Sequence, residues 1–402
     1  MKVLVAHNYY QQAGGEDQCF AAEVALLRAN GQEVIEYRAD NHAIDGMSRL
    51  SVAARTIWNR KTYREVRALI RDHRPQVAHF HNTFPLISPA AYYAARAERV
   101  GVIQTLHNFR LLCPNALFFR DGRVCEDCLG KSVPWPGVVH KCYRDSRSAS
   151  AAVTTLLTVH RVLGTWHQAV DTYIALTETS RRKFVEGGLP VDKVVVKPNF
   201  VDPDPGPGTG AGGYGIFVGR LSAEKGIETL LTAWKQLADK VPLKVVGEGP
   251  LSPMVGASAA STARIEWLGK QPMDRVCELV GEASFLVLPS RCYENFPRVV
   301  VEAFVKGTPV VASGFGAMAE IVADGRTGVH FEPGNPCDLA EKVQHLLAQP
   351  QALKRMRAAA RDEYDDRYTA NANYSQLATI YERAIGQRHR GTATVPAPGG
   401  RS

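Results

Sequence analysis

Two cations in the second half of the chain have the type and spacing to bind a diphosphate. Arg220 and Lys225 lie in the segment GRLSAEKG, directly after the apolar run Gly215–Val218. Arginine offers a fork of N–H donors and lysine a compact charge, and the N-terminus of a following helix would add partial positive charge. The alternative is a surface turn that carries two solvated cations.

Two carboxylates follow a later apolar run, in the segment SRCYENFPRVVVEAF after Phe285–Leu288. Glu294 precedes an expected helix that starts near Pro297, with Asn295 as a candidate cap, and Glu302 lies inside that helix. A carboxylate among valines needs a polar partner, and two adjacent ribose hydroxyls can both donate to it. A partly exposed helix position is the alternative for Glu302.

The first half offers a glycine pair and a histidine, each directly after an apolar run. Gly14 and Gly15 allow the backbone to approach a ligand closely, although a plain flexible loop has the same composition. His107 follows the run Val102–Leu106, and a neutral imidazole can both donate and accept a hydrogen bond. A structural histidine is the alternative.

These residues follow apolar runs because the whole chain alternates such runs with helical patterns, which predicts parallel α/β sheets. Ligands of such sheets bind at the carboxyl ends of the strands. In the first half we expect strands at Lys2–Ala6, Val34–Tyr37, Gln76–Phe80, Val102–Leu106, Thr172–Leu176 and Val194–Lys197. In the second half we expect them at Gly215–Val218, Leu243–Val246, Ile265–Leu268, Phe285–Leu288, Pro309–Ala312 and Val329–Phe331.

A chain of 402 residues is too long for one ordinary core, so two domains are expected. The stretch DPDPGPGTGAGG lacks apolar periodicity and is predicted to be the linker. The expected organisation is an N-terminal domain at 1–200, the linker at 201–213 and a second domain at 214–361. We also expect a helix at 362–386 that packs back on the first domain, followed by a disordered tail at 387–402.

The motifs together resemble one family. Glu294 and Glu302, with seven residues between them, resemble the E-x7-E signature of retaining glycosyltransferases of the GT-B fold in the GT4 group. GRLSAEKG is similar to the donor-phosphate motif of that group, and VGEGP and WLGK fall where the group has its glycine turn and its base-contacting strand end. The resemblance implies two doubly wound Rossmann-like domains that face each other across a cleft, and no catalytic metal.

The resemblance also implies roles for the residues of the second domain. Arg220 and Lys225 would bind the donor diphosphate and stabilise it as it departs. Glu302 would hold the ribose, and Glu294 would contact the donor sugar near the reacting carbon. Backbone amides around Asn295 and Phe296 would meet phosphate or sugar. Many members have glycine where this chain has Pro297, which removes one backbone donor.

In the first domain the resemblance places Gly14 and Gly15 near the donor phosphate and the acceptor, and His107 beside the donor sugar. Glu294, His107, Arg220 and Lys225 are therefore the candidate catalytic residues, although neither Glu294 nor His107 is expected to be a nucleophile. The family is described through front-face attack, in which the leaving phosphate helps to remove the acceptor proton.

The implied function is transfer of a sugar from a UDP- or GDP-sugar to a saccharide, lipid-linked or small-molecule acceptor. A nucleotide-sugar isomerase on the same fold is one alternative, but it would not be expected to combine GRLSAEKG with the glutamate pair. A non-catalytic nucleotide-sugar-binding subunit is another, and lost cations or carboxylates would favour it. All four of these side chains are present.

Four cysteines lie in one stretch rich in proline, glycine and charge, at Cys113, Cys125, Cys128 and Cys142. One C-x2-C pair with outlying cysteines is compatible with a tetrahedral structural zinc that staples a long loop. Four reduced thiols are the alternative, and the sequence leaves both open.

Composition narrows the partners. The net charge of +8 fits anionic ligands but is too mild for a dedicated nucleic-acid binder. No apolar stretch reaches the length of about 20 residues that spans a bilayer, and the N-terminus lacks a signal-peptide core, so a cytoplasmic protein is expected. The basic stretch Arg55–Arg74 is compatible with contact at the inner face of the membrane, and the solvated face of a sheet-covering helix is the plainer alternative.

Overall fold

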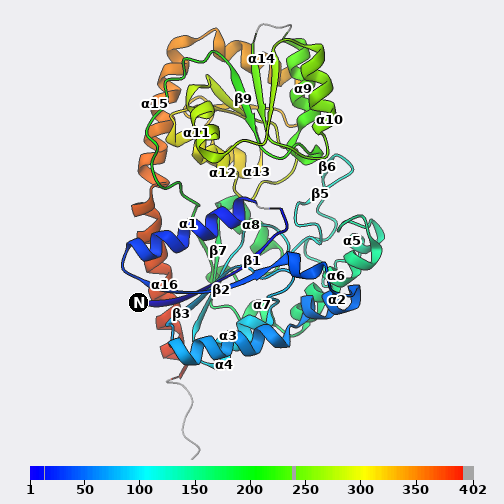
Figure 1. The fold of residues 1–402 in the computed structure, drawn as a ribbon, viewed down its shortest axis with the longest axis vertical. Coiled ribbons are helices and arrows are strands. Elements are labelled where there is room, and N and C mark those ends of the chain that lie inside the picture. Colours follow the sequence, from blue (N-terminus) through cyan, green and yellow to red (C-terminus); the bar gives the residue numbers. More distant parts are fainter. Residues whose placement is uncertain (13, 238–240, 393–402) are drawn as a thin grey trace, which may run out of the picture. The chain divides into compact units, whose positions relative to one another are not determined.

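The protein forms two compact units, each with one parallel sheet (Figure 1). The computed structural model describes residues 1–12, 14–237 and 241–392. The first unit comprises Met1–Ala116, Glu126–Pro198 and the chain from Asn373 onward. The second comprises Leu117–Cys125 and Asn199–Ala372. Both are doubly wound α/β units, so the predicted fold class is confirmed.

The sheet of the first unit has the order β2-β1-β3-β4-β7-β8, and all its strands run parallel. The order reverses between β1 and β3, and an open parallel sheet binds ligands at such a switch point. All six strands predicted from the first half are present. They are β1 (Lys2–Tyr9), β2 (Glu33–Asp40), β3 (Val77–Asn82), β4 (Gly101–Thr105), β7 (Thr172–Ala175) and β8 (Val194–Val196).

Helices pack on this sheet because an amphipathic helix buries its apolar face against the strands. In α1 (Gly15–Ala29), Phe20, Val24 and Leu27 recur at helical spacing and pack against Val3 and Val5 of β1. The other helices of this unit are α2 (Arg49–Ile57), α3 (Arg60–His73), α4 (Ala90–Ala97), α5 (Pro136–Val139), α6 (Arg147–Val162), α7 (Thr165–Gln168) and α8 (Glu178–Glu186).

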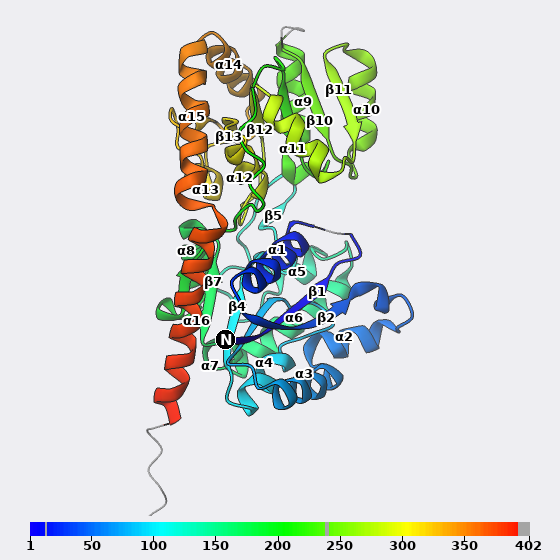
Figure 2. The ribbon, with the colours of Figure 1, turned by 60° about the vertical axis from the view of Figure 1, so that its left-hand side comes forward.

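The last helix, α16 (Ala370–Thr392), completes the core of the first unit, as Figure 2 shows. Leu377, Tyr381 and Ala384 lie in the same buried cluster as β1. The sequence predicted one helix at 362–386, but α15 (Pro350–Arg367) ends before Tyr368, whose buried ring belongs to the core of the second unit. The helical backbone continues to Thr392, into the predicted disordered tail, and residues 393–402 lie outside the described part of the chain.

The second unit has the strand order β11-β10-β9-β12-β13-β14, with its switch point between β9 and β12. All six strands predicted from the second half are present: β9 (Gly215–Val218), β10 (Leu243–Val246), β11 (Ile265–Gly269), β12 (Phe285–Leu288), β13 (Val310–Ser313) and β14 (Gly328–Phe331). Two buried clusters pack on the sheet. They involve α9 (Ile227–Gln236), α10 (Ser252–Ser261), α11 (Met273–Glu282), α12 (Arg298–Val305), α13 (Gly316–Ile321), α14 (Pro336–Leu347) and α15.

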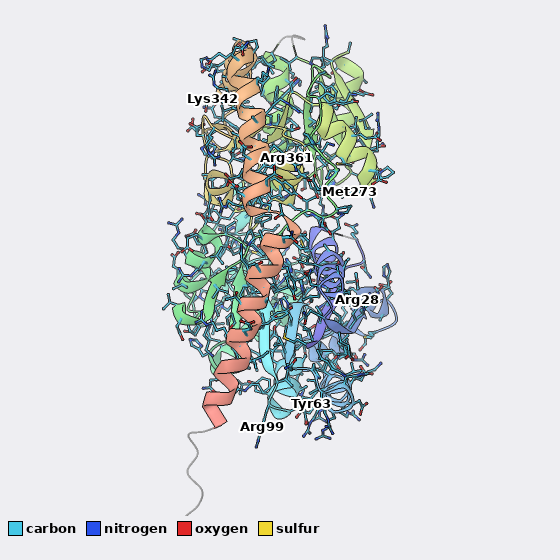
Figure 3. The ribbon with its side chains drawn as sticks, turned by 90° about the vertical axis from the view of Figure 1, so that its left-hand side faces the viewer. Arg28, Tyr63, Arg99, Met273, Lys342 and Arg361 are labelled. Atoms are coloured by element: carbon cyan, nitrogen blue, oxygen red, sulfur yellow. The ribbon has the colours of Figure 1, made fainter. Side chains whose placement is uncertain are left out.

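The predicted linker at 201–213 is bound to the second unit. The backbone N–H groups of Gly208, Gly210 and Gly212 donate to carbonyls of that unit at 2.9 Å each. A Cβ on Gly208 would lie 2.2 Å from the carbonyl oxygen of Gly281, so the glycine permits this contact. Arg361 of α15, labelled in Figure 3, pairs with Asp204 of the segment at 2.6 Å. The Gly- and Pro-rich composition therefore serves close backbone packing here.

A hairpin from the first half of the sequence also belongs to the second unit. It consists of β5 (Phe119–Arg120) and β6 (Arg123–Val124), which the sequence placed in the first domain. The ring of Phe118 meets the ring of Tyr293 edge to face, with centroids 6.2 Å apart. A Cβ on Gly122 would lie 3.5 Å from the guanidinium of Arg291. No helix in the described part of the chain is long and apolar enough to cross a membrane.

Candidate functional site

The loops that follow β9 and β10 are held in place by close backbone contacts. Gly226 has φ +72°, and a Cβ there would lie 1.8 Å from the carbonyl oxygen of Pro289. A Cβ on Gly247 would lie 1.9 Å from the carbonyl oxygen of Gly219. These glycines in GRLSAEKG and VGEGP are therefore required by the fold, and they bring the ends of the two strands together.

A lysine, a glutamate and a serine meet at the ends of β9 and β12, the two strands that flank the switch point. Lys225 Nζ lies 2.6 Å from Glu294 Oε1, and Ser290 Oγ donates to the same oxygen at 2.6 Å. Burial lowers the pKa of Lys225, but Glu294 more than offsets this, so the pKa is raised. The side chain of Lys225 is 27% exposed and its ammonium stays charged, so it can also meet an anion.

The other predicted residues of the second unit lie around this group. Arg220 is exposed and makes no ion pair with any described residue. Glu302 Oε1 lies 3.0 Å from Arg298 Nε, and burial raises the pKa of the Glu302 carboxyl although Arg298 lowers it. The structure thus brings Lys225 and Glu294 into contact and leaves Arg220 and Glu302 outside that contact.

The start of α12 differs from the prediction. The helix begins at Arg298, with Pro297 as its N-cap residue, and no side chain caps it, so the expectation of an Asn295 cap is wrong. Proline at this position has no N–H to donate. In the described part of the chain the backbone N–H of Phe296 makes no hydrogen bond, and it remains a donor for a ligand oxygen.

In the first unit the glycine pair opens α1 without a structural need for glycine. Gly14 has φ −130°, and a Cβ on Gly14 or Gly15 would meet no described heavy atom within 4 Å. Asp17 Oδ2 accepts from the Gly14 N–H at 2.9 Å, and Asp17 Oδ1 lies 2.7 Å from His7 Nε2. The space beside the pair is open, and a role of the pair in ligand binding stays a prediction.

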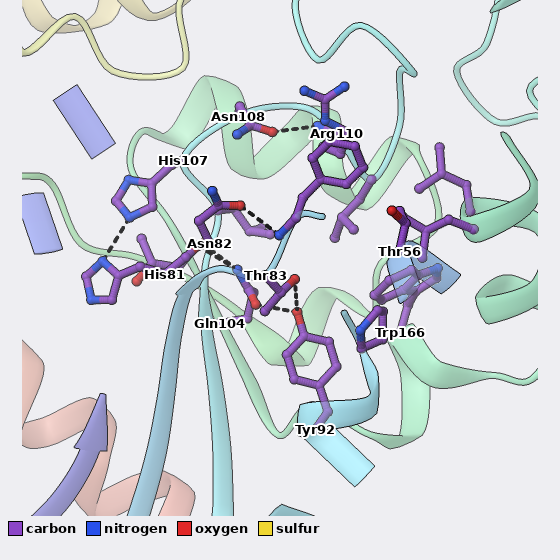
Figure 4. A pocket seen from close by; sticks show the side chains of 17 residues that line it. Thr56, His81, Asn82, Thr83, Tyr92, Gln104, His107, Asn108, Arg110 and Trp166 are labelled. Atoms are coloured by element: carbon purple, nitrogen blue, oxygen red, sulfur yellow. Dashed lines mark hydrogen bonds between the residues drawn. The ribbon is translucent and has the colours of Figure 1, made fainter. Parts of the chain in front are cut away.

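A pocket in the first unit begins at the carboxyl ends of β3 and β4 (Figure 4). His81 and His107 lie at one end of it and Trp166 at the other. Asn82 donates to the carbonyl of Asn8 at 2.7 Å and accepts from the N–H of Phe84, which fixes its amide. The pocket is therefore lined by polar groups with fixed directions.

Two buried polar atoms beside this pocket make no hydrogen bond with any residue that the structure describes. Glu16 Oε1 accepts from Asn108 Nδ2 at 2.6 Å, but Glu16 Oε2 makes no hydrogen bond. The guanidinium of Arg110 lies over the rings of Phe84 and Tyr143, and its Nε makes no hydrogen bond. Buried unpaired groups are costly, so a ligand or an ordered water can supply the missing hydrogen bond at each of these two atoms.

The sequence missed a buried network behind His107. His107 Nε2 lies 3.0 Å from His81 Nδ1, and His81 Nε2 lies 3.1 Å from Glu23 Oε1. His79 Nδ1 lies 3.0 Å from the same oxygen, and Lys197 Nζ lies 3.1 Å from Glu23 Oε2. Two signals could have revealed it: the H-x-H pattern in a strand, which puts both rings on one face, and a glutamate on the apolar stripe of α1.

The cysteine prediction is not decided. Cys113, Cys128 and Cys142 belong to the first unit, whereas Cys125 belongs to the hairpin of the second. A structural zinc held by the four therefore stays a prediction.

Two family models match the chain. Residues 213–363 match "Glycosyl transferases group 1", and residues 21–205 match "Glycosyltransferase Family 4". Together the two matches cover most of both units.

Curated relatives match over part of their length. The α-D-kanosaminyltransferase of Streptomyces kanamyceticus is 30% identical over 178 residues, which is 42% of this chain and 45% of that protein. The α-maltose-1-phosphate synthase of Mycolicibacterium smegmatis is 30% identical over 182 residues, 42% of this chain and 47% of that protein. A phosphatidyl-myo-inositol mannosyltransferase of Mycobacterium tuberculosis is 29% identical over 247 residues, 58% and 65% of the two chains. The chain thus spans about half the length of the first curated relatives it matches.

Solved structures share the fold at low sequence identity. Anabaena Alr3699/HepE in complex with UDP superposes with a TM-score of 0.66 at 17% identity, over 95% of this chain and 100% of that one. Sucrose-phosphate synthase from Thermosynechococcus elongatus gives a TM-score of 0.71 at 16% identity, over 96% and 100%.

Proposed function

Because the chain belongs to the GT4-type glycosyltransferases, which have the GT-B fold, we propose that it transfers a sugar from a UDP- or GDP-sugar with retention of anomeric configuration. The acceptor is a saccharide, a lipid-linked sugar or a small molecule. The observation that carries the proposal is the contact of Lys225 with Glu294 and of Ser290 with the same carboxylate, at the switch point of a parallel sheet.

The donor diphosphate is the ligand that suits this group. Lys225 carries a charged, partly exposed ammonium, and Arg220 adds an exposed guanidinium from the same loop. Negative charge develops on the diphosphate as it leaves, and fixed cations stabilise that charge more in the transition state than in the bound donor. The two cations supply what a divalent ion supplies elsewhere, so the reaction proceeds without a catalytic metal.

The remaining residues hold the rest of the donor. Glu302 accepts from the ribose hydroxyls, and the free N–H of Phe296, with the backbone at Asn295, meets phosphate or sugar. Glu294 contacts the sugar beside the reacting carbon. Because Glu294 Oε1 already accepts from two donors, it orients the sugar and does not act as the nucleophile. Attack then comes from the acceptor hydroxyl, whose proton passes to the leaving phosphate.

The acceptor binds to the first unit, beside the glycine pair and His107. Glu16 Oε2 is a buried acceptor and Arg110 Nε a buried donor, and neither makes a hydrogen bond with a described residue. A hydroxyl donates to the first, and an oxygen of the acceptor accepts from the second. The rings of Phe84 and Tyr143 flank the guanidinium and offer apolar faces to a sugar ring.

A lipid-linked acceptor would bring the protein to the inner face of the membrane, and the structure suggests a surface for this other than α3. One face of the stretch Arg55–Arg74 serves the fold, since Val66 and Ile70 are buried, whereas Arg60, Lys61 and Arg64 are exposed. The contacting helices α2, α5 and α6 instead expose apolar side chains at Leu50, Trp135, Val139 and Val162, with exposed cations at Arg49, Lys131, Lys141, Arg144 and Arg147. Binding to anionic but not to zwitterionic vesicles, reduced by Trp135→Ala, is the expected result.

The identity of the donor is tested by measuring the melting temperature of the protein with a panel of UDP, GDP, ADP and their common sugar conjugates, with and without EDTA. Binding to the folded state raises the melting temperature. We expect the nucleotides of one base to raise the melting temperature equally with and without EDTA. In a second measurement we expect slow release of the sugar from that donor, with the α or β configuration of the donor retained. No shift with any nucleotide would overturn the proposal.

The same panel separates the alternatives. A nucleotide that binds without sugar release or transfer would indicate a binding subunit, and conversion of the donor to an isomeric nucleotide-sugar would indicate an isomerase. A fall in melting temperature with EDTA alone would support a structural zinc at the four cysteines.

A further inference from the structure

The side chain of His107, beside which the proposed function places the acceptor, has one hydrogen-bonding partner among the described residues. Its Nε2 lies 3.0 Å from Nδ1 of the buried His81, and the ring centroids lie 5.1 Å apart. The dashed line between the two rings in Figure 4 marks this hydrogen bond. The other ring nitrogen, Nδ1, makes no hydrogen bond with any described residue. What His107 offers to a ligand depends on which of its nitrogens carries the proton.

The proton positions can be deduced from the far end of the network. Burial raises the pKa of Glu23, but Lys197, His79 and His81 more than offset this and hold the pKa well below its usual value. The carboxylate is therefore ionised and can only accept. Burial lowers the pKa of His81 to about 4 and that of His107 well below its usual value. Both imidazoles are neutral near pH 7 and carry one proton each.

These constraints leave one arrangement. His81 Nε2 faces Glu23 Oε1 at 3.1 Å and must carry the proton of that ring. His81 Nδ1 then has only a lone pair, so the hydrogen bond at 3.0 Å needs the proton of His107 on Nε2. His107 Nδ1 is left with a lone pair.

We propose that Glu23 and His81 are positioning residues that make His107 Nδ1 a hydrogen-bond acceptor, so that the site selects a substrate hydroxyl at this point. The selection for a hydroxyl rests on the proposed function, whereas the proton positions do not. A ring oxygen or carbonyl offers no proton to such a nitrogen. Binding of a ligand with such a group at this point is therefore disfavoured, because His107 Nδ1 would be buried without a partner.

The same cluster has the composition of a metal site, and its contacts argue against that use. Donor atoms of Glu23, His79 and His81 lie within 4.8 Å of one another. However, Lys197 Nζ lies 3.1 Å from Glu23 Oε2 and is held by Asn373 Oδ1 at 2.9 Å. The ammonium of Lys197 already neutralises the negative charge of Glu23, and a divalent ion beside this ammonium would be repelled.

The chain offers a substitution that reverses the arrangement. Lys197 can only donate, so in Glu23→Gln the amide oxygen must face Lys197 and the amide NH2 must face the histidines. His81 Nε2 then has to accept, His81 Nδ1 carries the proton, and His107 Nε2 accepts it. His107 is left with its proton on Nδ1 and becomes a donor at the same place.

The experiment is 15N NMR of the histidine rings in the full chain, with His107 assigned by the signal lost in His107→Gln. The expected result is the Nε2–H form of His107 in the wild type and the Nδ1–H form in Glu23→Gln. His160, whose Nε2 donates to the carbonyl of Ile57 at 2.8 Å, serves as an internal Nε2–H reference that must not change. An Nδ1–H form of His107 in the wild type would overturn the inference, whether or not the variant folds.

Activity distinguishes this inference from the proposed function. Glu23→Gln leaves the loop of Lys225 untouched, so nucleotide affinity should be unchanged while turnover of the sugar donor falls about tenfold or more, the value of one hydrogen bond. A wild type that binds no nucleotide defeats the proposed function and leaves the proton positions standing. If Glu23→Gln has the Nδ1–H form of His107 but turns over the donor at the wild-type rate, His107 does not select a substrate hydroxyl.

Discussion

Both units contain lysine–glutamate pairs, and two of these pairs, one from each unit, have different roles. In the second unit Lys225 and Glu294 lie 2.6 Å apart, and their side chains are 27% and 11% exposed. In the first unit Lys197 and Glu23 lie 3.1 Å apart, and their side chains are 2% and 5% exposed. The chemical groups are the same, so their surroundings decide what each pair does.

The surroundings differ in how many partners are supplied by the protein. Lys197 also meets Asn373, and Glu23 also meets His79 and His81, so the buried charges are compensated within the unit. Lys225 keeps an exposed side on a loop at the end of a strand. A buried charge that is fully paired within the protein stabilises the fold, whereas a partly exposed charge can also bind a ligand.

The largest effect is expected at the buried pair. Lys197→Met should lower the free energy of unfolding by about 3–5 kcal/mol, because it leaves Glu23 buried without its cation. Urea denaturation measures the change, with the exposed Lys235→Met as the matched control. If Lys197→Met costs no more than the control, the buried pair does not stabilise this unit.

At the open pair the effect should fall on activity. Lys225→Ala should lower donor turnover by about 10²–10³-fold, the range seen when one group that stabilises transition-state charge is removed. Its free energy of unfolding should change by less than about 1 kcal/mol, as for other partly exposed pairs. Lys235→Ala is the control. Full activity in Lys225→Ala would contradict the assignment of the diphosphate site.

The buried histidines predict how stability depends on pH. In the unfolded chain histidines protonate near a pKa of about 6.5, whereas burial holds the pKa of His81 in the folded protein at about 4. The unfolded state binds more protons between these values, so stability falls as the pH falls from about 6.5 to about 4. His81→Gln should make this dependence shallower. An equal slope in both proteins would count against a neutral His81.

The smallest effect concerns the ribose. Glu302→Gln should weaken binding of the donor nucleotide, UDP or GDP, about tenfold, because the amide accepts less strongly than the carboxylate and loses a charge-assisted bond. The exposed Glu341→Gln is the control in calorimetric titrations. The 2′,3′-dideoxy form of the nucleotide lacks both ribose hydroxyls, so the wild type and Glu302→Gln should bind it with equal affinity. If the variant still binds this form about tenfold more weakly than the wild type, Glu302 does not contact the ribose.

The sequence predicted the sheets well because strand signals are local. All twelve expected strands are present, since buried parallel strands are short apolar runs bounded by turn residues. The candidate donor residues were predicted for a related reason: GRLSAEKG and the glutamate pair follow strands directly, and strand ends are where such sheets bind ligands. The contact of Lys225 with Glu294 follows from β9 and β12 being neighbours.

Other features depended on where distant segments meet. The segment 201–213 has the composition of a flexible linker, and only its backbone hydrogen bonds to α11 and to the end of α12 show that it is bound. The break before α16 and the place of the hairpin at Leu117–Cys125 likewise follow from tertiary packing. Composition does not report such contacts, because the same glycines serve flexibility and close approach.

The sequence by itself determined the fold class, the strands and the chemical groups of the candidate donor site, because each depends on short runs of neighbouring residues. The buried network was decided by the tertiary structure alone. Lys197 reaches Glu23 across 174 positions of the chain, and His79 reaches Tyr381 across 302. Whether such a lysine, glutamate or histidine is buried, paired or open to a ligand depends on what packs around it, and that is fixed only when the chain has folded.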